Sequence, residues 1–268
     1  MARPVIESLF PEFCNQGGDN GNMMYLRASL PEAEFVETSF TDEPAFATRD
    51  VDFIYLGYMT EAEQELVATK LMPLRDRLVE LAEAGCTMLF TGSAAELLGE
   101  GITMADGRVV PGLRLFDFAC TQDLSERIVE VFLGRFEEER KQATRAAADV
   151  DDALSADGSA LEIVGYKIQF TQARIGDGTA AFAGALPFCT AEVGFGLNRG
   201  SRLEGFRYKN LFATWLCGPM LPLNPLFTER LISLMEGGHS EAAFRSEALA
   251  AYAKRLEEFR TPGIKMPI

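Results

Sequence analysis

The chain has 268 residues, of which 47% are hydrophobic and 24% are charged, a composition typical of a folded globular protein. Its formal net charge of -15 excludes nucleic acid as an expected partner, because a protein binds a phosphate backbone by neutralising it with Lys and Arg. No stretch has the roughly 20 consecutive apolar residues of a membrane-spanning helix. The N-terminus has no signal-peptide pattern, so we expect a cytoplasmic protein.

The cysteine and histidine content predicts no disulfide framework, metal site or cofactor. The five cysteines are an odd number, are widely spaced and form no CxxC pair. The single histidine, His239, lies in a polar segment near the C-terminus. We therefore do not expect a histidine-based metal site or catalytic dyad.

The first half of the chain predicts strands that alternate with helices. Apolar or alternating runs predict strands at residues 4–10, 33–38, 51–56 and 87–90. Helical patterns begin near residue 21 and follow at 60–84, with a kink or break at Pro73, and at 94–98. Because strands and helices alternate, we expect a mostly parallel sheet with right-handed crossovers. A hairpin turn is predicted at 105–107.

The second half is expected to be more antiparallel. Residues 123–149 have a charged helical pattern, and we interpret the acidic segment 149–159 as a solvated insertion. Strands are predicted at 161–171, 179–182 and 211–216, with hairpin-like turns at 176–178 and 198–200. Asn224 and Pro225 predict the start of a further helix.

These elements suggest one main domain followed by a terminal helix. We assign the domain to residues 1–237 and a C-terminal amphipathic helix to 238–268. Apolar side chains recur near one face of that helix, which is expected to pack on the domain or on a partner.

The segment 86–99, CTMLFTGSAAELLG, predicts a buried strand that turns sharply into a helix. Hydrolases and transferases place a nucleophile on such a turn. Gly92 occupies the position at which the reactive residue is expected, and glycine has no side chain to react.

A glycine-rich turn, CNQGGDNGN at 14–22, precedes the first predicted helix. Backbone N–H groups in such a loop can hold an anion. The spacing is neither that of a P-loop nor that of GxGxxG, so no phosphate motif is indicated. A structural turn and a partner contact remain open interpretations.

Taken together, the segments 17–22, 52–57, 90–99 and 207–225 resemble class I glutamine amidotransferases. They read GGDNGN, DFIYLG, FTGSAAELLG and RYKN…GPMLPLNP, in that order. The chain is most similar to the cobyric acid synthase type, and within it to the glutaminase subunits of lipid II isoglutaminyl synthases, over roughly residues 5–235. The resemblance implies a three-layer, flavodoxin-like α/β fold with a mostly parallel central sheet and an antiparallel extension.

The resemblance also implies that the catalytic positions are replaced. The family's cysteine nucleophile, in a pattern like CGGYQLLG, aligns with Gly92, and a shift of one residue would bring Ser93 to the turn. The family's histidine base, in a pattern like YLHGPLLPKNP, aligns with Cys217. A thiol with an ordinary pKa near 8.5 is poorly suited to shuttle protons at neutral pH.

Other positions of the implied substrate pocket differ as well. The family's glycine-rich oxyanion loop aligns with Gly57, Tyr58 and Met59, whose side chains are expected to crowd the pocket. In the related subunits a loop of the form ENHGG carries a histidine, and Gln169 takes its place here.

Seven residues match the family motifs although the chemistry is absent, and they are candidates for partner binding. They are Gly18, Asp19, Asn20, Gly21, Asn22, Arg207 and Tyr208. The alternatives are that these turns determine the fold, or that they border a small-molecule pocket that no longer hydrolyses its ligand.

We therefore predict a degenerate glutamine amidotransferase-like protein without glutaminase activity, which binds, scaffolds or regulates an amide-forming, Mur-ligase-like synthetase. The alternative is an active glutaminase with rearranged catalytic residues, which supplies ammonia for lipid II or cobyric acid amidation. In that alternative Cys217 becomes the nucleophile, whereas a buried, inert thiol is the competing interpretation. An interaction module formed by the acidic surface and the C-terminal helix is the third possibility.

Overall fold

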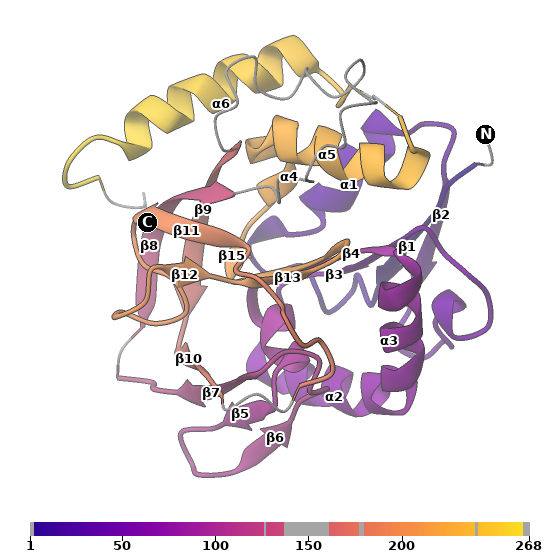
Figure 1. Ribbon diagram of the computed structural model, residues 1–268, viewed down its shortest axis with the longest axis vertical. Coiled ribbons are helices and arrows are strands. Elements are labelled where there is room, and N and C mark those ends of the chain that lie inside the picture. Colours follow the sequence, from indigo (N-terminus) through magenta and orange to yellow (C-terminus); the bar gives the residue numbers. More distant parts are fainter. Residues whose placement is uncertain (1–2, 126, 137–160, 177–179, 239–240, 265–268) are drawn as a thin grey trace.

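The computed structural model describes residues 3–125, 127–136, 161–176, 180–238 and 241–264 (Figure 1). Within these ranges a six-stranded sheet runs in the order β13-β14-β4-β3-β1-β2. Its strands are β1 (Val5–Leu9), β2 (Glu34–Thr38), β3 (Phe53–Leu56), β4 (Thr87–Thr91), β13 (Phe206–Tyr208) and β14 (Leu211–Thr214). Neighbours pair in parallel except for the edge strand β13. The predicted parallel sheet is confirmed.

Helices cover both faces of this sheet, which gives three layers (Figure 1). On one face lie α1 (Gly21–Ser29), α4 (Met220–Leu223), α5 (Pro225–Glu236) and α6 (Arg245–Phe259), and on the other α2 (Glu61–Leu71) and α3 (Arg75–Ala84). The break predicted at Pro73 is present, because the short 3-10 helix η3 (Met72–Leu74) separates α2 from α3. Thr60 and Glu63 begin α2 with a capping box.

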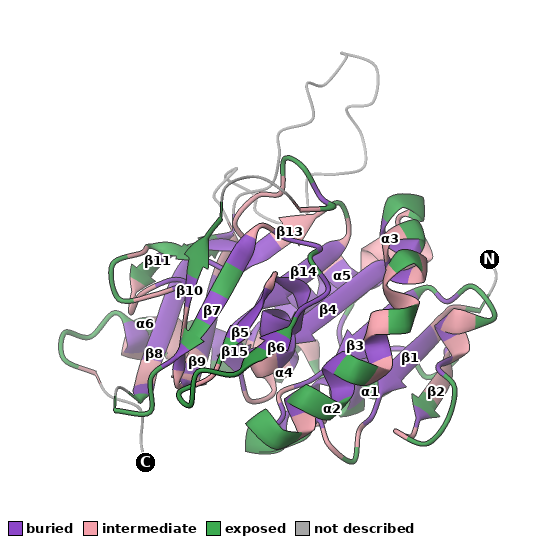
Figure 2. Cartoon of the chain, turned by 90° about the horizontal axis from the view of Figure 1, so that it is seen from below, coloured by how far each residue is buried: buried purple, intermediate pink, exposed green. Residues whose placement is uncertain are grey.

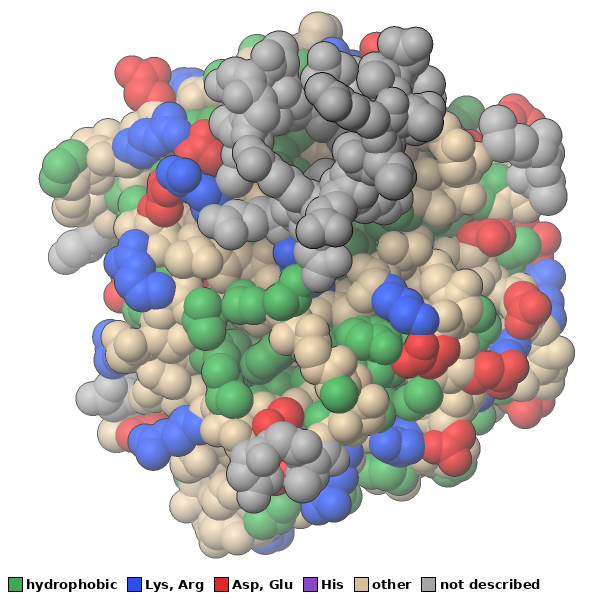
Figure 3. Space-filling view, in the orientation of Figure 1, with side chains coloured by type: hydrophobic (Ala, Val, Ile, Leu, Met, Phe, Trp, Pro, Cys, Tyr) green, Lys and Arg blue, Asp and Glu red, His purple; other side chains and the backbone are tan. Residues whose placement is uncertain are grey.

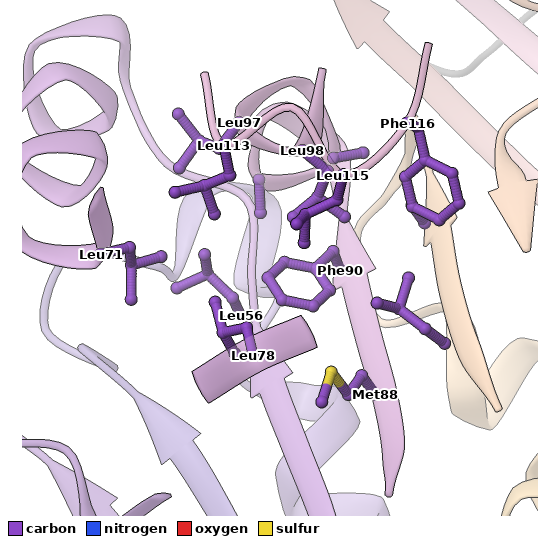
Figure 4. Close-up of a cluster of buried hydrophobic side chains, with 14 of the residues drawn as sticks. Leu56, Leu71, Leu78, Met88, Phe90, Leu97, Leu98, Leu113, Leu115 and Phe116 are labelled. Carbon is purple, nitrogen blue, oxygen red and sulfur yellow. The ribbon is translucent and has the colours of Figure 1, made fainter. Parts of the chain in front are cut away.

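The central strands are buried on both faces (Figure 2). This explains why their sequences are almost continuously apolar rather than alternating. Figure 4 shows one core cluster, in which side chains from β3 and β4 meet those of α2, α3 and the segment after β4. The packing fixes the position of the turn that follows β4.

Smaller sheets form the predicted antiparallel extension. One has the order β10-β7-β5-β6 and the other β12-β11-β8-β9-β15. Their strands are β5 (Gly101–Thr103), β6 (Val109–Pro111), β7 (Phe118–Gln122), β8 (Ile128–Phe136), β9 (Leu161–Gln169), β10 (Thr171–Ile175), β11 (Cys189–Val193), β12 (Leu203–Glu204) and β15 (Leu216–Cys217). The pair β5–β7 is parallel and the other pairs are antiparallel.

The helix predicted over 123–149 is wrong where the structure describes it. Residues 128–136 form β8, which pairs along its whole length with β9. The sequence IVEVFLGRF is rich in β-branched and aromatic residues, which pack well on a pleated surface. Residues 137–149 and the acidic segment 149–159 lie outside the described residues.

Other boundaries also differ from the predictions. The segment 94–98 belongs to a 3-10 helix, η4 (Gly92–Leu98), rather than to an α-helix. No strand forms at 180–182, because the N–H groups of Ala181 and Phe182 donate to the carbonyls of Arg114 and Leu115 in a loop. The strand predicted at 211–216 is interrupted at Trp215, and its end joins another sheet as β15.

The helix predicted at Asn224 and Pro225 is present as α5, but Asn224 does not cap it with its side chain. The Asn224 carboxamide instead accepts from Val164 N at 2.8 Å and donates to Val164 O at 2.8 Å. It thereby ties the start of α5 to β9.

The final helix, α6, packs on the rest of the chain. Tyr252 and Phe259 are buried, and the Tyr252 hydroxyl donates to Glu162 O at 2.7 Å. In the described ranges no helix combines the length and apolar character needed to cross a membrane. On the face seen in Figure 3, acidic and basic side chains lie beside one another mainly around the edge, whereas hydrophobic side chains gather near the centre.

Candidate functional site

A cavity of about 150 Å³ opens where β3 and β4 end, next to the junction of β9 and β10. It is lined by several residues that the sequence predicts for the site: Tyr58, Met59, Gly92, Ser93 and Gln169. Leu56 pairs with Phe90 in the parallel register of β3 and β4, so the loops that follow these strands lie side by side. Gly57 and Cys217 are not among the lining residues.

Gly92 has a left-handed backbone conformation and no space for a side chain. Its φ of 58° lies in the left-handed region, which glycine adopts readily and L-residues rarely adopt. A Cβ built on Gly92 would lie 2.7 Å from Cβ, Cγ and Cδ2 of Tyr58. The Tyr58 side chain therefore fills the space that a side chain at position 92 would need.

Tyr58 is fixed from both ends. Its backbone N–H donates to Asp19 Oδ2 at 2.8 Å, and its hydroxyl donates to the carbonyl of Ile168 on β9 at 3.1 Å. Burial is the main cause that raises the pKa of the Tyr58 hydroxyl above its ordinary value. The side chain is thus a neutral phenol that bridges the loop after β3 and strand β9.

Ser93 is fully occupied by hydrogen bonds to one neighbouring residue. Its Oγ accepts from Met59 N at 3.1 Å and donates to Met59 O at 2.7 Å. Since the hydroxyl proton is directed at a carbonyl, Ser93 has no proton to transfer to a base in this arrangement. Its role is to hold the loop after β3 against the turn after β4.

Cys217 is 2% exposed and lies at the end of β15. Its Sγ faces Tyr166 O at 3.5 Å, and burial raises the pKa of the thiol to about 12. A thiol of this pKa is protonated at neutral pH and is neither a base nor an activated nucleophile.

Gln169 lies in the cavity wall and is 6% exposed. Its Nε2 donates to Thr171 O at 2.6 Å. Among the residues that the structure describes, no donor reaches its Oε1, although that atom is buried. An enclosed carboxamide oxygen without a donor is unfavourable unless a ligand or water supplies one.

Glu96 is a cavity residue that was not identified from the sequence. It is 3% exposed, and burial raises the pKa of its carboxyl to about 7. Its Oε1 accepts from Thr171 Oγ1 and from Trp215 Nε1 at 3.2 Å, and its Oε2 accepts from Gln64 Nε2 at 2.9 Å. The one feature of the sequence that could have indicated Glu96 is that it is an acidic residue within the otherwise apolar segment AAELL.

The glycine-rich turn carries a buried acid. Asp19 is 0% exposed, and its Oδ2 accepts from Thr91 Oγ1 at 2.5 Å and from Tyr55 OH at 2.8 Å, in addition to Tyr58 N. Burial raises the pKa of Asp19 to about 6. Asp19 therefore joins the turn to the ends of β3 and β4 and sets the position of Tyr58.

Asn22 connects this turn to the late proline-containing loop. Its Nδ2 donates to Asp19 Oδ1 at 3.1 Å and to Tyr55 OH at 2.9 Å, and its Oδ1 accepts from Leu221 N at 2.8 Å. A Cβ on Gly21 would lie 2.8 Å from Cβ of Pro219. These contacts hold the glycine-rich turn against the segment GPMLPLNP.

The proposed partner-binding residues therefore differ in accessibility. Asp19 and Asn22 are buried and face the interior, whereas Gly18 is exposed and Asn20 and Gly21 are half-buried. For Asp19 and Asn22 the geometry favours the fold-determining alternative over a direct partner contact.

Arg207 and Tyr208 lie at the opposite end of β4 from Gly92, because Asn210 O accepts from Met88 N at the start of that strand. The Tyr208 ring stacks on Phe182 with centroids 4.4 Å apart, and its hydroxyl donates to Glu83 Oε1 at 2.9 Å. The structure thus separates these residues from the glycine-rich turn.

No protein-family model matches the chain. The chain is 28% identical over 222 residues to lipid II isoglutaminyl synthase (glutamine-hydrolyzing) subunit GatD of Staphylococcus aureus (strain N315). The aligned region covers 81% of this chain and 78% of that protein. This similarity supports a glutamine amidotransferase-like family.

Among solved structures, PurLQS from Thermotoga maritima is similar with a TM-score of 0.51 and 12% identity, covering 95% of this chain and 100% of that one. This similarity supports the fold. A glutamine amidotransferase from Thermotoga maritima matches with a TM-score of 0.49 and 8% identity, covering 97% and 93% of the two chains.

Proposed function

We propose that this chain is a glutamine amidotransferase-like protein without glutaminase activity, and that it acts as a binding, scaffolding or regulatory partner of an amide-forming synthetase. The observation that carries the proposal is the contact between Gly92 and Tyr58. At the turn where a glutaminase would need a nucleophile, the chain has a glycine, and an aromatic ring fills the space.

The histidine that the resemblance implies as general base is also missing from the described cavity lining, whose acids are Glu61 and Glu96. Among the described lining residues there is neither histidine nor cysteine. Cys217 stands at the position that the resemblance assigns to the base, but its burial and raised pKa make it an inert thiol. Gln169 offers a carboxamide, which does not exchange protons at neutral pH.

A synthetase partner is proposed from the relative. GatD is named as a subunit of lipid II isoglutaminyl synthase, and this chain covers 78% of its length. We further propose that the synthetase partner is Mur-ligase-like. We also propose that this chain is of the cobyric acid synthase type. The division into a domain over 1–237 and a separate C-terminal helix belongs to the same proposal, with α6 as an additional contact element.

The test uses the complex of this chain with the synthetase encoded in its source organism. Amide formation is measured with either glutamine or ammonium chloride as the nitrogen source. The proposal predicts that the chain co-purifies with the synthetase and that the complex forms amide from ammonium but not from glutamine. Glutamine-dependent amide formation that is lost in Ser93→Ala or Cys217→Ala would instead support a glutaminase with rearranged catalytic residues.

A further inference from the structure

We propose that the cavity beside Gly92 binds the primary ammonium group of a small organic amine. The inference rests on the proposed function, because a cavity without a nucleophile can hold a ligand without transforming it. The buried side chains of its wall have spare hydrogen-bond acceptors, whereas each of their donor atoms is already hydrogen-bonded within the protein, and an ammonium group consists of donors alone.

The donor atoms of the buried and half-buried wall side chains are hydrogen-bonded within the protein; the exposed Gln16 carboxamide, which also lines the cavity, is not among them. Gln64 Nε2 donates to Ser93 O and Glu96, Gln169 Nε2 to Thr171 O, and the Tyr58 hydroxyl to Ile168 O. The Ser93 hydroxyl donates to Met59 O, and the Thr171 hydroxyl and the Trp215 indole N–H both donate to Glu96. A ligand that needs donors from these side chains would have to break existing bonds.

The acceptors are not exhausted. Gln169 is more than nine-tenths buried, and no described group donates to its Oε1. Glu96 Oε2 accepts a hydrogen bond from Gln64, and a carboxylate oxygen has room for a second. A donor-rich group placed between these residues would complete both.

Charge and wall composition favour a cation over a neutral donor. Glu61 also lines the cavity and acts on Glu96 as a like charge, so a positive group between them would relieve repulsion. Tyr58, Phe170 and Trp215 add aromatic surface, against which ammonium groups and short alkyl chains bind well. Arg127 already lies over the Phe170 ring, 5.6 Å from its centroid, so the aromatic contact to a ligand is left to Tyr58 and Trp215.

The size of the cavity limits the ligand. Its volume of about 150 Å³ compares with the roughly 30 Å³ that one water occupies in the liquid. An ammonium group with a short carbon chain is of matching size. The same chemistry is present at the end of a lysine side chain, so a free amine and a lysine of a protein are two sources of one ligand group.

The chain provides its own reporter for this site. Trp215 is the single tryptophan of the sequence, it lines the cavity, and its indole N–H donates to Glu96. A ligand that changes the environment of Glu96 will change the fluorescence of Trp215.

The test is a titration of the purified chain with ethylammonium chloride, followed by Trp215 fluorescence and by calorimetry. Ethanol and sodium chloride are the matched neutral and ionic controls. In a second titration the ligand is Nα-acetyl-lysine amide, which represents the side chain of a lysine in a protein. We expect a saturable response to ethylammonium, to the lysine amide or to both, and none to the controls. The ligand that binds with the higher affinity shows whether the site prefers a free amine or a lysine side chain.

Two variants locate the bound group, and a third is a control. Gln169→Leu should weaken amine binding about tenfold, because it removes an acceptor to a charged donor. The exposed Glu61→Gln variant should weaken it in the same direction, whereas Gln172→Leu, outside the cavity lining, should leave it unchanged. No saturable response, or an equal response in wild type and both cavity variants, would overturn the inference. Neither result depends on glutamine or on a synthetase, so the proposed function is tested separately.

Discussion

The side chain of Tyr58 lies where a side chain of Gly92 would have to be: a Cβ on Gly92 would approach the Tyr58 Cβ, Cγ and Cδ2 atoms to 2.7 Å. The two residues are 34 positions apart and meet because β3 and β4 pair in parallel and end together. The contact has consequences for stability that can be measured.

Gly92→Ala is expected to destabilise the fold by roughly 2–5 kcal/mol, the sum of a strained left-handed φ and a steric overlap. In a Tyr58→Ala background the cost should fall, because the overlap is removed and the backbone strain remains. Urea denaturation of the single and double variants measures this coupling.

Gly107→Ala is the matched control for the Gly92 variant. Gly107 has a φ of 86°, and a Cβ there would meet nothing within 4 Å, so this variant reports the backbone strain alone, about 1 kcal/mol. Equal destabilisation by Gly92→Ala and Gly107→Ala would contradict the steric contact.

Cys217 is expected to resist thiol reagents in the folded protein. Burial raises its pKa to about 12, so the reactive thiolate is scarce at pH 8. Alkylation with iodoacetamide, followed by peptide mass spectrometry, should label Cys217 far more slowly than in urea-unfolded protein. Rapid labelling with a midpoint below pH 9 would revive the interpretation of Cys217 as a nucleophile.

Glu96 is expected to make the fold less stable as pH rises. Its folded pKa of about 7 lies above the ordinary value of 4.5, so the native state holds a proton that the unfolded state has lost between these values. The stabilisation is complete below about pH 4.5 and is lost as pH rises to about 7, a change on the order of 3 kcal/mol. Asp19, with a folded pKa of about 6, acts in the same direction.

Comparing Glu96→Gln with wild type isolates this effect. Urea denaturation at pH 5 and at pH 8 should show a smaller loss of stability in Glu96→Gln, because the carboxamide does not titrate. Glu100→Gln removes another acid four residues away and serves as the control. An unchanged pH dependence in Glu96→Gln would show that Glu96 is already ionised at pH 5.

Asn22→Ala is expected to cost about 2–4 kcal/mol, since it removes bonds to Asp19, Tyr55 and Leu221 and leaves buried groups unpaired. Asn20→Ala is the comparison within the same turn, because its half-buried side chain donates to Pro11 O. A small effect of Asn22→Ala on thermal unfolding, together with loss of partner binding, would favour the docking alternative.

The parallel half of the fold could be predicted because its signals are local. Strands β1, β3 and β4 are short apolar runs that end at turns, and helices follow them in a regular order. Strand β8 was missed because its sequence lies within a charged stretch that has a helical pattern. Its pairing partner, β9, begins 25 residues after β8 ends, so a local pattern does not contain it.

The sequence predicted several of the residues that belong to the candidate site but not how their side chains contact one another. Gly92, Ser93, Tyr58 and Gln169 were identified by their positions in motifs, whereas the overlap of Tyr58 with Gly92 depends on the pairing of β3 and β4. Glu96 resembles an ordinary helical residue until Thr171 of β10 and Trp215, at the break between β14 and β15, are brought to it.

The most direct measurement is ammonia release from glutamine by the purified chain, compared with the same protein after heat denaturation. The proposed function predicts no difference between the two, because it assigns the nucleophile position to Gly92, where Tyr58 leaves no space for a side chain. Turnover above the denatured control that is lost in Ser93→Ala or Cys217→Ala would contradict it.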